Sequence, residues 1–297
     1  MTSRTGLTAG KGPAHRSCAA RCACAVLLAA LPVTAGAGER FWSFEWYQAQ
    51  KQGFAGPVDY EESGQRLVHV VRGASAAEWV LGHEYRIFGQ PPVGGATARS
   101  NGHMHAISAQ WRKRHGGWEV RIAPTLATSS NRVFRPQAWT AADWRVDGAL
   151  LRVAADGAHG GWRAGFVADA RFGSYRVYPV VAWETVAGPL RAVLGWPDGT
   201  AEWQVAPTLA LTLAAGPDGG EWTAGDRDDP SFATEIAQRR WRTALELRWQ
   251  MGGALRLTAG AARFVGHTWR YHLSDGRVTE LELPDDTAFV ARLVLAF

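Results

Sequence analysis

The sequence predicts an all-β fold, in the form of a single antiparallel transmembrane β-barrel. Three observations favour this fold. The start of the chain has the features of an export signal, most of the remainder alternates apolar and polar residues, and the last segment alternates up to a terminal aromatic residue, Phe297. A chain of 297 residues is long enough for one large domain.

Residues 1–37 are predicted to be a signal peptide that is cleaved on export. A basic segment ending at Arg21 precedes a short apolar run from Cys22 to Val33, and Ala35-Gly36-Ala37 offers small residues for cleavage. The apolar run is shorter than the roughly 18 residues that a membrane-spanning helix needs. No cysteine follows it where lipid attachment would require one. The barrel is therefore expected to comprise residues 38–297.

The basic excess of the chain lies almost entirely in this signal. The full sequence has 32 Lys and Arg against 27 Asp and Glu, and removal of residues 1–37 leaves 28 basic against 27 acidic residues. A nearly neutral mature chain gives no electrostatic reason to expect a nucleic-acid partner. Cys18, Cys22 and Cys24 also lie in the signal. The mature chain then has no disulfide, thiol nucleophile or cysteine-ligated zinc.

The strand prediction depends on residues that alternate with period two. Between Arg240 and Gln250, one face carries Trp241, Thr243, Leu245, Leu247 and Trp249, and the other carries Arg240, Arg242, Glu246, Arg248 and Gln250. Successive side chains of a strand point to opposite faces, so a strand separates these two sets, whereas a helix would mix them. The pattern recurs at 118–126, 162–172, 255–261 and 289–297.

The polar face is predicted to line the lumen of the barrel. It combines arginine and carboxylate side chains with Gly and Ala, which suits a narrow and crowded interior. Two interpretations remain open: an arginine lumen that binds anions or selects for them, and an internal network of ion pairs that stiffens the wall. The predicted lumen and ion-binding residues are Arg121, Arg163, Asp169, Arg171, Arg240, Arg242, Glu246, Arg248 and Arg292.

The number of strands is predicted to be about 12, within a range of roughly 10 to 14. The ambiguous region is 187–226, where Trp196-Pro197-Asp198-Gly199 and Val205-Ala206-Pro207 each read as a turn or as a kink within a strand. Long connections are expected near 51–65, 89–102, 127–143, 227–237 and 272–286. In membrane barrels such long loops face outward, and short turns face the periplasm.

The last strand resembles the signal by which the barrel-assembly machinery recognises bacterial outer-membrane proteins. Its apolar face consists of Phe289, Ala291, Leu293, Leu295 and Phe297, opposite Arg292. This resemblance implies the outer membrane of a Gram-negative bacterium as the location. It also implies contact with membrane lipid and lipopolysaccharide, and with periplasmic chaperones and the assembly machinery during biogenesis.

The body of the chain resembles the poorly characterised proteobacterial outer-membrane β-barrels that carry domains of unknown function. The segments that support this are Ser100-Asn101-Gly102-His103-Met104-His105, Ser129-Ser130-Asn131 and Leu194-Gly195-Trp196-Pro197-Asp198. The resemblance implies a barrel and a location, and it implies no activity.

Ser100-Asn101-Gly102 is also similar to the nucleophile segment of outer-membrane phospholipase A. That family has His two residues before the serine, whereas this chain has Ala98. His103 or His105 would then have to supply the base, although both share the parity of Ile107, which is expected to face lipid. The other interpretations are a loop with interfacial histidines and a metal chelated by His103 and His105.

These observations predict an integral outer-membrane barrel that is not an enzyme and that needs no cofactor or metal. Its expected role is structural or that of a narrow solute channel with an arginine-rich lumen, and the sequence does not identify the solute. The alternatives are a membrane-embedded, lipid-modifying serine hydrolase and a soluble secreted β domain that binds a ligand.

Overall fold

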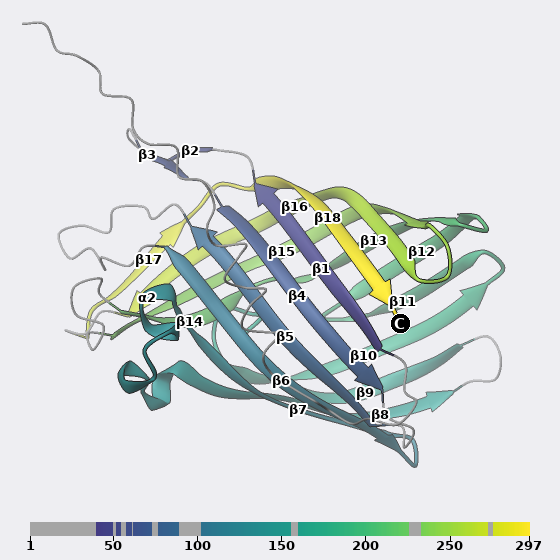
Figure 1. Cartoon of the computed structure of the whole chain (residues 1–297), viewed down its shortest axis with the longest axis horizontal. Helices are drawn as coiled ribbons and strands as arrows, with labels where there is room; N and C mark the ends of the chain where they lie inside the picture. Colours follow the sequence, from purple (N-terminus) through teal and green to yellow (C-terminus); the bar gives the residue numbers. More distant parts are fainter. Residues whose placement is uncertain are drawn as a thin grey trace, which may run out of the picture. The chain divides into compact units, whose positions relative to one another are not determined.

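A computed structural model describes residues 40–49, 52–54, 58–60, 62–72, 77–88, 102–155, 160–225, 233–272 and 276–297. Almost all of them lie in strands, which Figure 1 colours in chain order. The strands of the main wall are β1 (Arg40–Ala49), β4 (Glu62–Arg72), β5 (Ala77–Phe88), β6 (His103–His115), β7 (Trp118–Ser129), β8 (Trp144–Ala155), β9 (Gly160–Asp169), β10 (Arg176–Ala187), β11 (Leu190–Trp196), β12 (Gly199–Ala206), β13 (Leu209–Pro217), β15 (Ala233–Gln250), β16 (Leu255–His272) and β18 (Asp286–Ala296).

The remaining described elements are short. They are β2 (Gln52–Phe54), β3 (Val58–Tyr60), β14 (Gly220–Gly225), β17 (Val278–Glu282), the helix α2 (Ser130–Val133) and the 3₁₀ turns η1 (Pro136–Ala138) and η2 (Ala141–Asp143). β2 and β3 pair only with each other. No helix in these described ranges is long and apolar enough to cross a membrane.

The main wall is a closed antiparallel barrel, as predicted. Each strand pairs with its neighbours in the order of the preceding list, and β1 closes the ring by pairing with β18 from Phe41↔Ala296 to Ala49↔Ala288. Closure matters because a lipid-exposed strand edge would leave backbone N–H and C=O groups without partners. The described wall has 14 strands, which is the upper limit of the predicted range and not the central value of about 12.

The error in the strand number comes from the ambiguous region. Both of its uncertain segments are turns, so β11, β12 and β13 are three separate strands. β12 and β13 are joined through Pro207 and Thr208 only. Such short connections place more strands in the same length of chain than the average spacing allows. Other boundaries differ as well. β15 already begins at Ala233 and β17 (Val278–Glu282) lies wholly inside an expected connection, whereas β9 ends at Asp169, which places Arg171 in a connection.

The outer face of the wall is apolar. Phe166, Val177, Val181 and Leu194 have 58 to 66% of their surface exposed. Phe289, Leu293, Leu295 and Phe297 of the last strand are exposed on the same face. Exposed tryptophans lie near strand ends, among them Trp118, Trp162, Trp196 and Trp249. An apolar belt with tryptophan at its borders is the surface that a bilayer requires of a barrel.

Two strands are much longer than the rest and change direction partway. β15 and β16 have 18 residues each, whereas the other wall strands have 7 to 13. Their pairing shifts register between Arg239 and Trp241, because β16 carries one extra residue there. Gly266 lies in the extra stretch with φ of 61°, a conformation that glycine adopts without strain. This β-bulge marks the level at which the hairpin bends.

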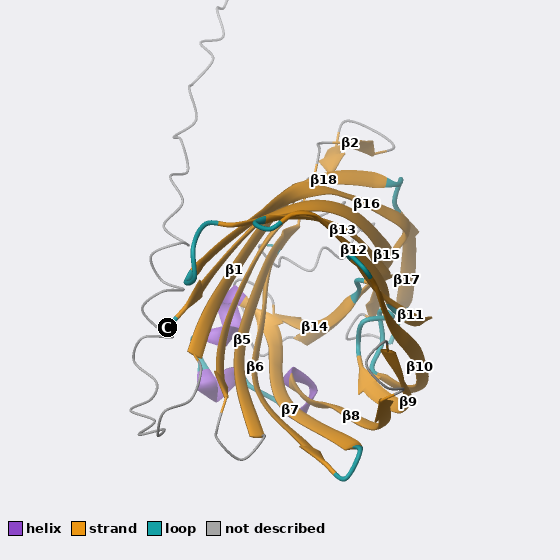
Figure 2. Ribbon diagram, turned by 90° about the vertical axis from the view of Figure 1, so that its right-hand side faces the viewer, coloured by secondary structure: helices purple, strands orange, loops and turns teal. Residues whose placement is uncertain are grey.

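The neighbouring strands break at the same level. Asp218 and Gly219 separate β13 from β14, and residues 283–285 separate β17 from β18. Beyond these breaks, β14, residues 233–239, residues 267–272 and β17 form a small sheet in the order β14-β15-β16-β17. We call this sheet the cap. Figure 2 shows β14 running across the interior of the ring of wall strands.

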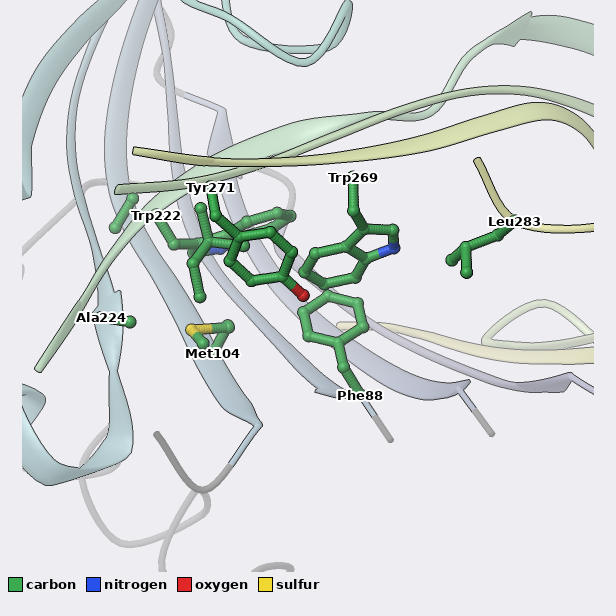
Figure 3. Close-up of a cluster of buried hydrophobic side chains, with 9 residues drawn as sticks. Phe88, Met104, Trp222, Ala224, Trp269, Tyr271 and Leu283 are labelled. Atoms are coloured by element: carbon green, nitrogen blue, oxygen red, sulfur yellow. The ribbon is translucent and has the colours of Figure 1, made fainter. Parts of the chain in front are cut away.

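The cap closes part of the barrel end at which the long connections lie, called here the loop end. β14 pairs with β15 along one edge and touches β7 at Thr223↔Thr128 along the other. The strand thereby connects β7 directly to β15 and bypasses β8 to β13. A buried apolar cluster fills the smaller ring that results (Figure 3), and its members are Phe88, Met104, Ala127, Trp222, Ala224, Ile236, Trp269, Tyr271 and Leu283.

Aromatic contacts hold the cap against the wall. Phe88 of β5 packs edge-on against Trp269 of β16, with ring centroids 4.4 Å apart, and against Trp222 of β14 at 5.7 Å. Trp269 has only 2% of its surface exposed. Burial of large aromatic side chains from both sides of the lumen stabilises the closed arrangement.

We predict that Trp269→Ala loosens the cap without opening the wall. Loss of a buried tryptophan typically costs about 3–5 kcal/mol through lost burial and the cavity left behind. Hydrogen exchange should accelerate for amides of β14 and residues 233–239, while amides of β10 to β12 keep their protection. The outward-facing Trp203→Ala is the control. Equal acceleration throughout the wall would contradict a separate cap.

Candidate functional site: a charged lumen beneath the cap

The lumen contains a cavity of about 440 Å³ whose walls are rich in charge. Inward-facing residues of β4 to β10 line most of it, and the connections after β9, β11 and β13 complete it. Its charged lining consists of six arginines, Arg66, Arg86, Arg121, Arg145, Arg163 and Arg171, and six carboxylates, Glu84, Glu119, Asp147, Asp169, Asp198 and Asp218. By formal charge this lining is balanced.

All six carboxylates are already paired with arginine. Arg171 bonds both Asp169, at 3.0 Å, and Asp198, at 2.9 Å. Arg145 pairs with Asp147, and Arg86 pairs with Glu84. The remaining two carboxylates take their nearest partners from outside the lining: Glu119 pairs with Arg112 and Arg114, and Asp218 pairs with Arg240.

Three arginines of the lining are left over. Within the ranges that the structure describes, the side chains of Arg66, Arg121 and Arg163 make no hydrogen bond and no ion pair. The six carboxylates of the lining are bonded to other arginines, and three of these, Arg112, Arg114 and Arg240, lie outside the lining. The groups still available to a solute in this cavity are therefore positively charged. A guanidinium group binds carboxylate or phosphate oxygens through two parallel hydrogen bonds.

The predicted lumen residues fall into three groups. Arg121, Arg163, Asp169 and Arg171 line the cavity. Arg242, Glu246, Arg248 and Arg292 form ion pairs on the opposite wall, where Arg292 also bonds Glu45 and Arg248 bonds Glu202. Arg240 is fully buried beneath the cap.

The pairs on the opposite wall correspond to the interpretation of the lumen as an ion-pair network. The partners Glu45, Glu62, Glu202 and Asp218 were not predicted from the sequence. Glu45 and Glu202 lie at inward-facing positions of their own strands, as their arginine partners do. The alternation of these two strands could therefore have identified both carboxylates as lumen residues.

The fully buried Arg240 joins the cap to the wall. Its guanidinium donates to Glu62 of β4 at 2.7 Å and to Asp218 at 2.6 Å. Its central carbon also lies 3.8 Å from the ring centroid of Phe264. Tyr47 of β1 donates its hydroxyl to Glu62 at 2.6 Å. Four separate segments of the chain therefore meet at this one guanidinium group, at the level of the bulge.

Polar contacts continue from this group into the cap. Gln238 donates to Glu62 at 2.9 Å and accepts from Arg86 at 2.7 Å. Trp269 donates its indole N–H to His267 Nε2 at 3.0 Å. Since indole nitrogen is only a donor, this His267 nitrogen is unprotonated. The cap is thus held by a hydrogen-bonded network as well as by its apolar cluster.

The predicted serine site is not assembled by the described residues. Ser100 lies outside them. His103 and His105 lie on β6, at positions that alternate with the cavity-lining Ala106 and Ser108, so they face outward. His105 Nε2 lies 2.7 Å from Ser130 Oγ, and its Nδ1 lies 3.0 Å from His83 Nε2. His103 bonds the Tyr85 hydroxyl. These contacts dock α2 onto the outer wall.

No three His, Cys, Asp or Glu side chains of the described segments come together as a metal site. The connection 130–143 folds around a different buried pair. Arg132 donates to Asp143 at 2.6 Å, and both side chains are inaccessible to solvent. Thr128 and Thr140 also donate to this carboxylate.

The closed wall, apolar belt and charged interior are those of a membrane β-barrel. No protein-family model and no curated protein matches the sequence. Among solved structures, the match to the NanC porin extends over 85% of this chain and 98% of the porin chain, at 8% sequence identity and a TM-score of 0.37.

Two further structures of this kind match. An outer-membrane channel from Pseudomonas putida F1 covers 90% of this chain and 97% of its own, at 11% identity and a TM-score of 0.39. The match to OprB from Pseudomonas putida extends over 88% of this chain and 94% of the OprB chain, at 7% sequence identity and a TM-score of 0.35.

We predict that Arg240→Ala strongly destabilises the protein. The substitution leaves Glu62 buried without its cation, a change that typically costs about 3–5 kcal/mol. The matched control is Arg191→Ala, which breaks an exposed pair with Glu184 worth roughly 0–1 kcal/mol. The temperature at which the folded band disappears on semi-native gels should fall much further for Arg240→Ala. Equal shifts of this temperature in the two variants would contradict a stabilising role of Arg240 at the junction.

A second prediction concerns acid and the connection 130–143. Burial opposes the charge of Asp143, but hydrogen bonds from Arg132, Thr140 and Thr128 outweigh it, so the pKa of Asp143 lies below its ordinary value. A lowered pKa in the folded state gives stability that is complete above the unfolded pKa of about 3.9 and is lost as pH falls through the folded pKa. Fluorescence of the adjacent Trp139–Trp144 pair should report this loss. Asp143→Asn should abolish the pH dependence and lower stability at neutral pH.

Proposed function

We propose that this protein is a narrow, non-enzymatic solute channel of a bacterial outer membrane, with a lumen that prefers small organic anions. Residues 1–37 act as the export signal in this proposal, and residues 38–297 are the mature barrel. Assembly through the exposed last strand, and contact of the apolar belt with lipid and lipopolysaccharide, follow from the same location. The apolar belt is unsuited to a soluble secreted domain.

The observation that carries the anion preference is the pairing of the cavity walls. Every carboxylate of the lining has an arginine partner, whereas Arg66, Arg121 and Arg163 have none among the described residues. Paired groups fix the shape of the lumen, because each ion pair holds two long side chains in one conformation. Unpaired guanidinium groups in a narrow pore attract anions and repel cations.

The cap fits a channel that does not stand fully open. The apolar cluster blocks part of the loop end with side chains that offer water few partners. Below it, the cavity of about 440 Å³ is of the size that holds a small organic molecule. A structural barrel with no transport role would need no accessible guanidinium groups without partners along its cavity, whereas a lumen that binds anions uses them.

We predict that wild-type protein in a planar bilayer conducts and prefers anions. Under a KCl gradient, the reversal potential should indicate chloride as the more permeant ion. Arg121→Gln combined with Arg163→Gln should move this potential toward zero or toward cation preference, because two of the three unpaired positive groups are then neutral.

The control is Arg152→Gln, on the outer face near the short turns, where the side chain donates to the carbonyl of Gly116. It should leave the reversal potential unchanged. A wild-type protein that never conducts would contradict the proposed channel function. Conductance with an unchanged reversal potential in the double variant would contradict only the proposed preference for anions.

A further inference from the structure

A second cavity, of about 310 Å³, lies beside the cap at the start of β8. It is touched by Trp144 and Val146, which face outward, and by Arg145, which faces the lumen. Successive residues of one strand point to opposite faces of the wall. A cavity that touches three successive residues is expected at an edge of the strand, where both faces of the wall can be reached.

The pairing of the strands explains the opening. Residues 144–147 pair with β7 on one edge, but pairing of β8 with β9 begins only at Gly148↔Ala168. β9 ends at Asp169, and residues 170–175 connect it to β10. The other edge of 144–147 therefore has no strand beside it in the described structure. We call this break in the wall the notch.

One aromatic side chain spans the notch. Tyr175, in the connection between β9 and β10, donates its hydroxyl to the carbonyl of Val146 at 2.5 Å. Its backbone N–H donates to Glu221 of β14 at 2.7 Å. The side chain is 44% exposed. Individual hydrogen bonds from Tyr175 and from Arg145, with no continuous strand pairing, close this part of the described wall.

The notch leads directly to the charged cavity. Arg145 lines both cavities, so the two adjoin at this residue. Its Nε donates to Asp147 at 3.1 Å, and its Nη1 donates to the carbonyl of Glu221 at 2.7 Å.

The carboxylates of the notch lining are already engaged. Glu221 accepts from Tyr175, Asp143 pairs with Arg132, and Glu235 lies 3.8 Å from His272. The Nε and Nη1 atoms of Arg145 are engaged as well, but its Nη2 makes no hydrogen bond to the described residues, so this atom is the donor that the lining offers to an anion.

We propose that the notch is a side entrance through which amphipathic organic anions pass from the outer surface into the lumen. The apolar body of such a molecule first contacts Trp144, Val146 and Tyr175, and its anionic group then reaches Arg145 and the unpaired arginines beyond. The inference rests on the proposed channel function and names its access route and solute class. Entry by this route does not require the cap to open: Ala127 and Trp222 of the apolar cluster border the notch, and the route inward passes Arg145.

The first experiment compares two substitutions of exposed, outward-facing valines. Val146→Trp narrows the notch, and Val181→Trp adds the same bulk to β10 away from it. The probe is naphthalene-2-sulfonate, which keeps its charge at all working pH values, and methanesulfonate is the hydrophilic comparison. In proteoliposomes, Val146→Trp should slow naphthalene-2-sulfonate uptake by about tenfold, and Val181→Trp should leave it near the wild-type rate.

The second experiment locks the cap. Residues 38–297 contain no cysteine, so Thr128→Cys with Thr223→Cys introduces one defined pair. Paired strands lie about 4.8 Å apart, within the range that a disulfide spans. The oxidised form should take up naphthalene-2-sulfonate as fast as the reduced form, which controls for the loss of both threonines.

The outcomes separate the two proposals. Uptake that survives the lock and falls only in Val146→Trp supports the side entrance. Uptake abolished by oxidation and restored by reduction would show that entry needs movement of β14 away from β7, which overturns a side entrance beside a closed cap and keeps the channel. Equal rates for Val146→Trp and Val181→Trp would also overturn it. A wild-type protein with neither conductance nor uptake overturns both.

Discussion

The rest of the structure depends on the pairing of every backbone N–H and C=O group in the wall. In lipid these groups have no water to bond, so the sheet has to close on itself, and β1 completes the ring by pairing with β18. Closure fixes the parity of each strand, since a slip of one residue would turn its charges outward. The apolar belt and the arginine lumen are therefore two consequences of one constraint.

The same constraint explains where the wall is allowed to break. The interruptions around the cap and the notch lie toward the loop end: the bulge at Gly266, the break at Asp218 and Gly219, and the late start of pairing between β8 and β9. Strands that leave the wall there take new partners, as β14 does with β15 and β7. Arg240 stabilises the junction because it neutralises carboxylates from two of the diverging segments.

Alternation predicted the antiparallel wall, because period two is a local property that survives in the sequence. It could not predict the cap. Residues 233–239 alternate like wall residues, and Trp269 resembles any wall tryptophan until a bulge three residues earlier redirects the strand. Nor could it show which arginines are unpaired. That depends on neighbours far apart in the chain, such as Glu62 and Arg240. The central estimate of about 12 strands was too low for a simpler reason: Pro207 is compatible with a kink within one strand as well as with a turn between two strands.

A wall with this alternation presents a passing solute with two incompatible surfaces. Outside, Trp144 and Val146 offer only apolar contact, and one residue away Arg145 offers only charge. A purely apolar molecule gains nothing by moving inward, because it would have to displace hydrogen-bonding partners of the arginines. A small hydrophilic anion gains nothing from the outer surface. A molecule with an apolar body and one anionic group can contact each surface in turn, with neither part left without a partner, and this complementarity ties the position of the notch to the chemistry of the lumen behind it.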